Sequence, residues 1–164
     1  MLQVLQAAVD DTPHVLAILT DAALWLRSRG IPAWDPAQLD AVMSPAVMRG
    51  EVYLAWLNGV AVGTVTLQWA DPLFWADRPD DAGYIHKLAV VRAAAGQQIG
   101  EHMVVWAEGQ ISATGRRYSR LDFPANNPAM QRFYARLGYE SRGEKVINGM
   151  TFSLREKLLG GDWT

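Results

Sequence analysis

The sequence predicts an α+β domain of the α/β sandwich-like kind, with a mixed, mostly antiparallel central sheet of about seven strands flanked by about four helices. Strand patterns dominate the middle of the chain, and helical patterns occur singly between them. Two Asn-Gly pairs, at 58–59 and 148–149, each separate two strand-like segments, which indicates tight hairpins. Because the chain has 164 residues, 50% of them hydrophobic, it is long enough to bury one core, and we expect a single domain over residues 1–164.

The first half of the chain is expected to hold two helices and three strands. Thr12 or Asp11 precedes Pro13, and Asp35 precedes Pro36; both arrangements are typical of a capped helix start. An apolar stripe at helical spacing follows the first start. The expected elements are, in order, a strand over 2–9, a helix from Pro13 to a stop at Gly30-Ile31-Pro32, a helix over 36–48, and strands over 51–57 and 60–69.

The second half opens with a loop over 71–83, which is too long for a tight turn and has the length typical of loops that carry function. Asn127-Pro128 is a further capped helix start, and Gly138 ends that helix. The expected elements are, in order, a strand over 84–91, a helix that begins near residue 99 and runs to about Thr114, a strand over 117–123, a short helix over 128–137, and strands over 139–147 and 150–158.

Composition excludes several classes of function. A net charge of −2 provides no basic field to attract nucleic acid, so no nucleic-acid partner is expected. The absence of Cys excludes disulfides, a Cys nucleophile and thiolate metal sites, and it is typical of a reducing cytoplasm. No metal site is expected. The N-terminus has no signal-peptide pattern, and no apolar run approaches the ~20 residues of a membrane-spanning helix.

The segment AGQQIG, at 95–100, joins an expected strand to an expected helix. The first N–H groups of a helix have no intrahelical partners, and the helix dipole adds partial positive charge there, so such a start binds anions. Gly96 and Gly100 would let a phosphate oxygen approach the backbone closely. The alternative is that Gly96 only turns the chain and Gly100 only leaves room for packing. The segment is neither a P-loop nor a dinucleotide-binding fingerprint.

Tyr134 lies near the end of the short helix within DFPANNPAMQRFYARLGYES, at 122–141. A tyrosine hydroxyl has a reference pKa near ~10, so it can protonate a departing thiolate. The alternative is a partly buried aromatic side chain whose ring packs and whose hydroxyl reaches water. Taken alone, this segment favours the packing interpretation.

Together the two segments resemble the GNAT-type N-acetyltransferase superfamily. In that family a strand is followed by Arg/Gln-x-x-Gly-x-Gly/Ala at a helix start, and later by Asn-x-x-Ala-x-x-x-Tyr-x-x-x-Gly-Phe/Tyr. The second pattern matches at Asn127, Tyr134 and Gly138-Tyr139, with Met130 in place of Ala. The first departs from the family, because Ala95 replaces Arg/Gln and Gln98 replaces the middle glycine. The resemblance covers nearly the whole chain and implies the GNAT fold.

The resemblance implies direct transfer of an acetyl group from acetyl-CoA (coenzyme A) to an amine through a tetrahedral intermediate. Tyr134 would protonate the leaving thiolate, and His86 would take the proton of the amine, with Asp122 or water as alternatives. The residues implied to bind the cofactor are Leu88, Ala89, Val90, Arg92, Gly96, Gln97, Gln98, Ile99, Gly100, Glu101, Asn127 and Tyr134. The strand residues among them would pair with the pantetheine arm as an added strand does.

The acceptor is expected to be an amine of a small molecule, a peptide or an antibiotic. The residues expected near it are Trp34, Asp35, Trp75, Tyr84 and Asp122, because acidic and aromatic groups attract a cationic amine. His86 is expected on the same strand face as Tyr84 and Leu88, by alternation. The alternative function is an acyl-CoA-binding sensor or assembly module with little catalysis. A homodimer is compatible with the Trp-rich composition.

Overall fold

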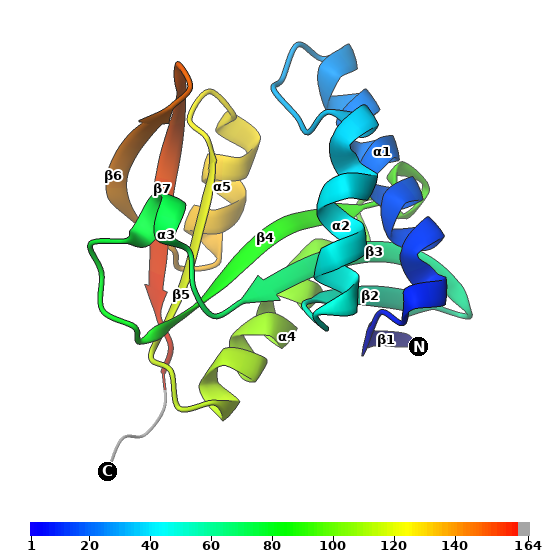
Figure 1. Cartoon of the computed structure of the whole chain (residues 1–164), viewed down its shortest axis with the longest axis horizontal. Coiled ribbons are helices and arrows are strands. Elements are labelled where there is room, and N and C mark those ends of the chain that lie inside the picture. Colours follow the sequence, from blue (N-terminus) through cyan, green and yellow to red (C-terminus); the bar gives the residue numbers. More distant parts are fainter. Residues whose placement is uncertain (161–164) are drawn as a thin grey trace. The chain divides into compact units, whose positions relative to one another are not determined.

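The computed structural model describes residues 1–160, and within them it contains seven strands and five α-helices (Figure 1). The strands are β1 Leu2–Gln6, β2 Val52–Leu57, β3 Val60–Gln68, β4 Ala82–Val90, β5 Tyr118–Pro124, β6 Glu140–Ile147 and β7 Met150–Leu158. The helices are α1 Thr12–Ser28, α2 Leu39–Met48, α3 Pro72–Trp75, α4 Ile99–Ala113 and α5 Pro128–Arg136. The predicted α+β class and strand number are confirmed. The fifth helix, α3, is a single turn inside the segment that was expected to be a loop.

The strands form one mixed sheet in the order β1-β2-β3-β4-β5-β7-β6. β4 and β5 pair in parallel, whereas β1–β2, β2–β3, β5–β7 and β6–β7 pair antiparallel. Both expected hairpins are present. Their turn residues all have positive φ, 51° and 80° at Asn58-Gly59 and 50° and 78° at Asn148-Gly149. This conformation matches the twist of the flanking strands, which explains why Asn-Gly occurs at both turns.

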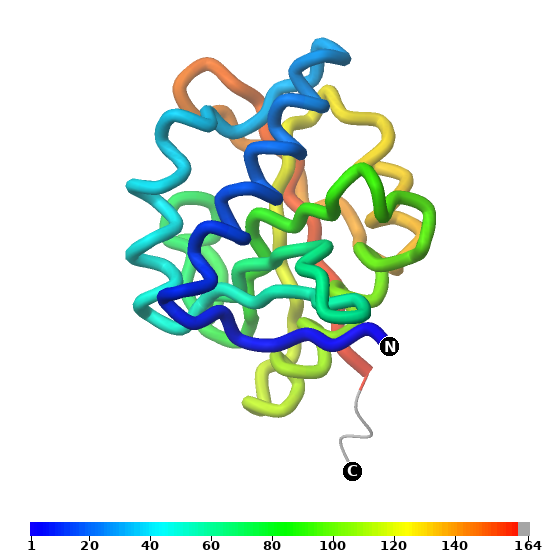
Figure 2. Tube along the Cα trace, turned by 90° about the vertical axis from the view of Figure 1, so that its right-hand side faces the viewer, coloured from blue at the N-terminus to red at the C-terminus, as the bar shows by residue number. Residues whose placement is uncertain are grey.

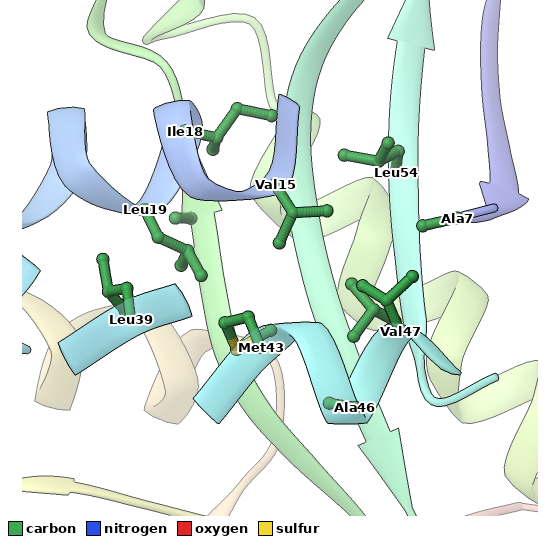
Figure 3. Close-up of a cluster of buried hydrophobic side chains, with 11 residues drawn as sticks. Ala7, Val15, Ile18, Leu19, Leu39, Met43, Ala46, Val47 and Leu54 are labelled. Atoms are coloured by element: carbon green, nitrogen blue, oxygen red, sulfur yellow. The ribbon is translucent and has the colours of Figure 1, made fainter. Parts of the chain in front are cut away.

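The chain divides into two compact units, and each is described by itself. Unit 1 comprises residues 1–67 and 87–106. Its core forms where α1 and α2, which run side by side, pack against β2 (Figures 2 and 3). Val15 and Leu19, four residues apart on α1, are both 0% exposed. Because residues i and i+4 lie on one face of a helix, the apolar stripe predicted from the sequence is the buried face of α1. Burial of each such side chain stabilises the fold by about 1.5–3 kcal/mol.

The caps of unit 1 differ in part from the prediction. Asp11 occupies the N-cap position of α1, but its carboxylate accepts from the N–H of Ala8 at 2.8 Å and so serves the preceding 3-10 turn. Thr12 is the first residue of α1, and its hydroxyl donates to the carbonyl of Val9 at 2.7 Å, so it is not a cap. Asp35 does cap, since it accepts from the N–H of Ala37 at 3.1 Å, although a 3-10 turn over Pro36–Gln38 precedes α2.

Unit 2 comprises residues 68–86 and the chain from 107 onward, and it is described to residue 160. In one of its buried clusters Trp75 and Tyr84 pack with Leu154. Gly83 on β4 has no room for a side chain, because a Cβ atom there would lie 2.4 Å from Cγ1 of Ile111. Asp71 caps α3 by accepting from the N–H of Phe74 at 3.2 Å, which explains why this segment begins with a helical turn.

No helix within residues 1–160 is both long enough and apolar enough to span a bilayer.

Candidate active site

The turn before α4 has two residues with positive φ, Gly96 at 81° and Gln98 at 59°. The N–H of His102 donates to the carbonyl of Gln98 at 3.0 Å, which is the first bond of the helix. The amides just before His102 therefore have no partner within the helix and point out of its start. A Cβ at Gly96 would meet nothing within 4 Å, so glycine is required there by the backbone angle and not by space. This geometry is suited to holding an anion at the end of α4.

Gln98 is a side-chain-bearing residue in the left-handed region, at the position where the family pattern has glycine. We expect Gln98→Gly to raise the free energy of unfolding by roughly 0.5–1 kcal/mol, because a left-handed conformation costs a non-glycine residue about 1–2 kcal/mol. That gain corresponds to a rise in Tm of about 1–4 °C, measured by thermal denaturation.

Gln97 provides the matched control for this prediction, since it is adjacent and has no positive φ. Gln97→Gly should lower the free energy of unfolding by roughly 0.5–1 kcal/mol, because it only adds freedom to the unfolded chain. A destabilised Gln98→Gly variant would show that the glutamine side chain has a contact that outweighs its backbone strain.

Arg92, one of the residues implied to bind the cofactor, contacts two side chains of α1. Its guanidinium lies over the ring of Trp25, 3.8 Å from the centroid. The backbone N–H of Arg92 donates to Oδ2 of Asp21 at 3.2 Å. Both contacts anchor the start of this turn to unit 1, and the role of Arg92 toward a cofactor stays a prediction.

The other cofactor residues predicted in this part of the chain surround the same turn. Ala89 is buried, whereas Leu88 and Val90 are half-buried. The N–H of Val91 donates to the carbonyl of Val62 at 2.9 Å, so β3 pairs with this end of β4. Ile99 is 3% exposed, and Gly100 and Glu101 follow it in the first turn of α4. These positions lie along one continuous path from β4 into α4.

In unit 2, the carboxylates of Asp71 and Asp122 lie close to the side chain of His86. Its Nε2 lies 3.0 Å from Oδ2 of Asp71, and its Nδ1 lies 3.8 Å from Oδ1 of Asp122. The side chains of Asp71 and Asp122 are only 7% and 10% exposed, and that of His86 is 22% exposed. Asp71 comes from the cap of α3, His86 from β4 and Asp122 from β5. We call this group the Asp71–His86–Asp122 cluster.

The sequence analysis singled out His86 and Asp122 but not Asp71, which begins the long loop expected over 71–83. Asp71 does carry a local signal, the Asp-Pro helix start, and that signal predicts the cap that is observed. Nothing local indicates that its second carboxylate oxygen faces His86, which is 15 positions further along the chain. The cluster therefore depends on the packing of α3 against β4.

Alternation along β4 does not hold through its whole length. Lys87 has a φ of 48°, which is a left-handed conformation inside the strand. A strand with such a residue loses its regular alternation of side chains between two faces. The prediction that His86 and Leu88 share a face therefore does not follow from their spacing, which is a correction to the sequence-based argument.

Tyr134 lies on α5 and is 4% exposed. Its ring stacks on Phe123, with centroids 5.7 Å apart, and meets Tyr139 edge-on at 5.5 Å. Burial raises the pKa of the Tyr134 hydroxyl above that of a free tyrosine, and the negative charge of Asp122 raises it further. The hydroxyl therefore stays protonated at neutral pH. Asn127 caps α5 as expected, since its Oδ1 accepts from the N–H of Met130 at 3.1 Å.

A buried network around Arg120 was missed in the sequence. Arg120 is 2% exposed, and it donates to Glu156 at 2.7 Å and to Asp81 at 3.0 Å. It also donates to the hydroxyl of Tyr84 at 3.2 Å. Tyr84, which was predicted to lie near the acceptor, takes part in this network and is 3% exposed. Trp75, the second aromatic residue predicted there, is 2% exposed in the same unit.

The remaining acceptor-side candidates, Trp34 and Asp35, belong to unit 1. Trp34 packs against the core of that unit, and Nζ of Lys87 lies 5.8 Å from its ring centroid. Asp35 is half-exposed and lies 4.0 Å from Arg27. His86 and Asp122 both belong to unit 2 and lie 3.8 Å apart, whereas Trp34 and Asp35 belong to unit 1.

Comparison with known proteins identifies the class. A model of the Acetyltransferase (GNAT) family matches residues 19–139, so the protein is an acyltransferase. The chain belongs to the GNAT acetyltransferase family. It is 30% identical over 145 residues to the uncharacterized N-acetyltransferase YesJ of Bacillus subtilis, which covers 84% of this chain and 81% of YesJ.

Solved structures agree with this fold. A GNAT acetyltransferase from Listeria monocytogenes superimposes with a TM-score of 0.79 at 26% identity, covering 96% of this chain and 95% of that one. PaiA N-acetyltransferase from Thermoplasma acidophilum, solved in complex with coenzyme A, superimposes with a TM-score of 0.77 at 13% identity, covering 96% and 99%. At that identity the second likeness concerns the fold alone. The predicted family and fold are thus confirmed.

Proposed function

We propose that this protein transfers an acetyl group from acetyl-CoA to an amine of a small molecule, a peptide or an antibiotic. The single observation that carries the proposal is the turn over Gly96–Gln98, where the positive φ values of Gly96 and Gln98 lead directly into the first turn of α4. The N–H groups of that turn have no partner within the helix. Those amides offer hydrogen bonds and partial positive charge to the pyrophosphate. The coenzyme A bound to the PaiA protein supports this choice of donor.

The pantetheine arm is assigned to the backbone of Leu88–Val90. The parallel ladder between β4 and β5 covers only Ala82–Tyr84 on the β4 side. An extended ligand can pair with strand backbone in the way an added strand does. In this arrangement a backbone N–H near Val90 polarises the thioester carbonyl and stabilises the oxyanion of the tetrahedral intermediate.

The reaction needs one proton acceptor and one proton donor. The amine nitrogen attacks the thioester carbon, and its proton passes to His86, to Asp122 or to water. The C–S bond then breaks, and the thiolate of coenzyme A takes the proton of Tyr134. The Tyr134 hydroxyl carries its proton at neutral pH, as a proton donor must, and the rise in its pKa on burial makes it a weaker acid than a free tyrosine. The chain has no Cys, so transfer is direct and has no cysteine-bound intermediate.

The acceptor is assigned to the amines because two carboxylates, Asp71 and Asp122, flank His86. Negative charge attracts an ammonium group, and an adjacent base removes its proton before attack. A cytoplasmic location and a homodimer belong to this proposal as predictions.

A thermal-shift experiment tests the donor. Ligands that bind the native state raise Tm by mass action. At a ligand concentration of 100 times Kd, the free energy of unfolding rises by about 2.7 kcal/mol. We expect a clear rise with acetyl-CoA and none with ATP at the same concentration. No rise at millimolar acetyl-CoA would contradict the proposal.

A turnover measurement distinguishes the transferase from the alternative function, a sensor or assembly module. Release of free coenzyme A, measured against a panel of small amines, amino acids and peptides, supports the transferase. Binding of acetyl-CoA without release for any acceptor in that panel supports the sensor.

A further inference from the structure

The two ring nitrogens of His86 face different carboxylates at different distances. Nε2 lies 3.0 Å from Oδ2 of Asp71, which is within hydrogen-bond distance, whereas Nδ1 lies 3.8 Å from Oδ1 of Asp122, which is beyond it. A neutral imidazole has one N–H donor and one acceptor nitrogen, and the partner of one nitrogen decides which of the two carries the proton. The closer carboxylate, that of Asp71, therefore decides the tautomer of His86.

The carboxylate of Asp71 is held in place for this contact by α3. Its Oδ1 caps the helix by accepting from the N–H of Phe74 at 3.2 Å. Its Oδ2 is buried and, apart from the contact with His86, has no hydrogen-bond partner among residues 1–160. Because a buried carboxylate oxygen is costly to leave without a donor, a proton on Nε2 stabilises the pair. A proton on Nδ1 would instead place two acceptors against each other at 3.0 Å.

We infer that Asp71 is a positioning residue that keeps the proton of neutral His86 on Nε2 and so leaves Nδ1 as the base that takes the proton of the acceptor amine. The base so defined rests on the proposed function, and it selects one atom among the candidates His86, Asp122 and water. The amine proton passes to the lone pair of Nδ1, and the ring becomes an imidazolium ion with its Nε2–H still facing Asp71. The negative charge of Asp71 then offsets the positive charge that the ring has gained. The His86 side chain is 22% exposed, so a ligand can reach it.

NMR of the imidazole nitrogens of the whole chain tests the tautomer, with neither acetyl-CoA nor an amine present. Long-range proton–nitrogen spectra at a pH of about 9, where imidazole side chains are ordinarily neutral, distinguish a protonated ring nitrogen from an unprotonated one. The chain has three His residues, and the signals that are absent from His86→Gln belong to His86. We expect Nε2 to carry the proton and Nδ1 to carry none.

The variant Asp71→Asn should reverse the tautomer. Asparagine caps a helix as well as aspartate does, so its Oδ1 should keep the N–H of Phe74 while its NH2 group takes the place of Oδ2. That NH2 group is a donor, so Nε2 must accept and the ring proton moves to Nδ1. Asp71→Ser also caps a helix and removes the carboxylate, so it should move the proton in the same direction. Asp77→Asn changes an exposed carboxylate of the same loop and, as the matched control, should leave the tautomer unchanged.

Steady-state kinetics test the role of Asp71 in catalysis. Asp71→Asn should lower kcat by about tenfold or more, leave KM for acetyl-CoA nearly unchanged, and have no further effect in a His86→Gln background. A structural role for Asp71 would instead add its own loss to that of His86→Gln, and this additive result would overturn the inference.

The NMR result stands apart from turnover. An unchanged tautomer in Asp71→Asn would overturn the inference, and so would a His86 ring that carries both protons at that pH, because it would offer no base. Absence of turnover in the unmodified chain, with the tautomers as expected, would contradict the proposed function and not the assignment of the ring proton.

Discussion

Replacing Tyr134 by phenylalanine should lower kcat for acetyl transfer by about a hundredfold or more, with little change in the affinity for acetyl-CoA. General acid catalysis contributes typically ~10²–10⁴-fold, and Tyr134→Phe removes the hydroxyl proton that the proposed mechanism gives to the thiolate. The ring itself remains, so its stacking on Phe123 is preserved. The measurement is steady-state kinetics together with the Tm shift caused by acetyl-CoA.

Tyr139 is the matched control, because it is a second buried tyrosine in contact with the first. Its hydroxyl lies 2.7 Å from Oγ of Ser119 and donates to Glu108 at 3.0 Å. Tyr139→Phe should therefore cost about 1–2 kcal/mol of stability through these lost bonds and leave kcat within about twofold. An unchanged kcat in Tyr134→Phe would remove Tyr134 from the mechanism, and an equal loss in both variants would indicate a packing effect.

Replacing Arg120 by methionine should destabilise the fold by about 3 kcal/mol, which lowers Tm by roughly 6–12 °C. The change leaves the carboxylate of Glu156, whose side chain is 5% exposed, without its shortest partner. Breaking one side of a buried ion pair costs about 3–5 kcal/mol. We expect the lower end, because Nε of Arg142 still lies 3.1 Å from Glu156. Denaturant unfolding measures the loss.

A surface pair and a double variant complete this experiment. Arg27→Met breaks an ion pair with Asp35 at 4.0 Å between half-exposed side chains, so it should cost less than about 1 kcal/mol. The double variant, Arg120→Met with Glu156→Gln, also removes the carboxylate charge of Glu156, and it should therefore recover part of the lost stability. If Arg120→Met were no more harmful than Arg27→Met, the buried network would not be a source of stability.

The features that local sequence predicted well are those that local physics controls. Asn148-Gly149 forms its hairpin because both residues tolerate positive φ, and Asn127 caps α5 because its short side chain reaches the N–H of Met130. The prediction that Thr12 caps the first helix was wrong, and the reason is also local. The carbonyl of Val9, three residues earlier, accepts its hydroxyl, and the helix starts at Thr12 itself.

The features that sequence did not reveal depend on residues far apart in the chain. Arg120 lies in the strand expected over 117–123, and nothing in the sequence singled it out. Its partner Glu156 is 36 positions away and pairs with it across β5 and β7. Lys87 broke the alternation from which the face of Leu88 was derived, and no local signal marks a positive φ at a lysine. Such contacts are set by strand register and packing, which a local pattern does not contain.

Local sequence patterns are sufficient to identify the class of this protein. The strand and helix periods, the two Asn-Gly turns, the segment from Ala95 to Gly100 and the spacing from Asn127 to Tyr134 are local patterns, and together they point to a GNAT acetyltransferase. The environment of His86, by contrast, depends on contacts between distant parts of the chain. Only the packing of α3, β4 and β5 brings two nearly buried carboxylates to its two ring nitrogens, because charges interact through space and not along the chain.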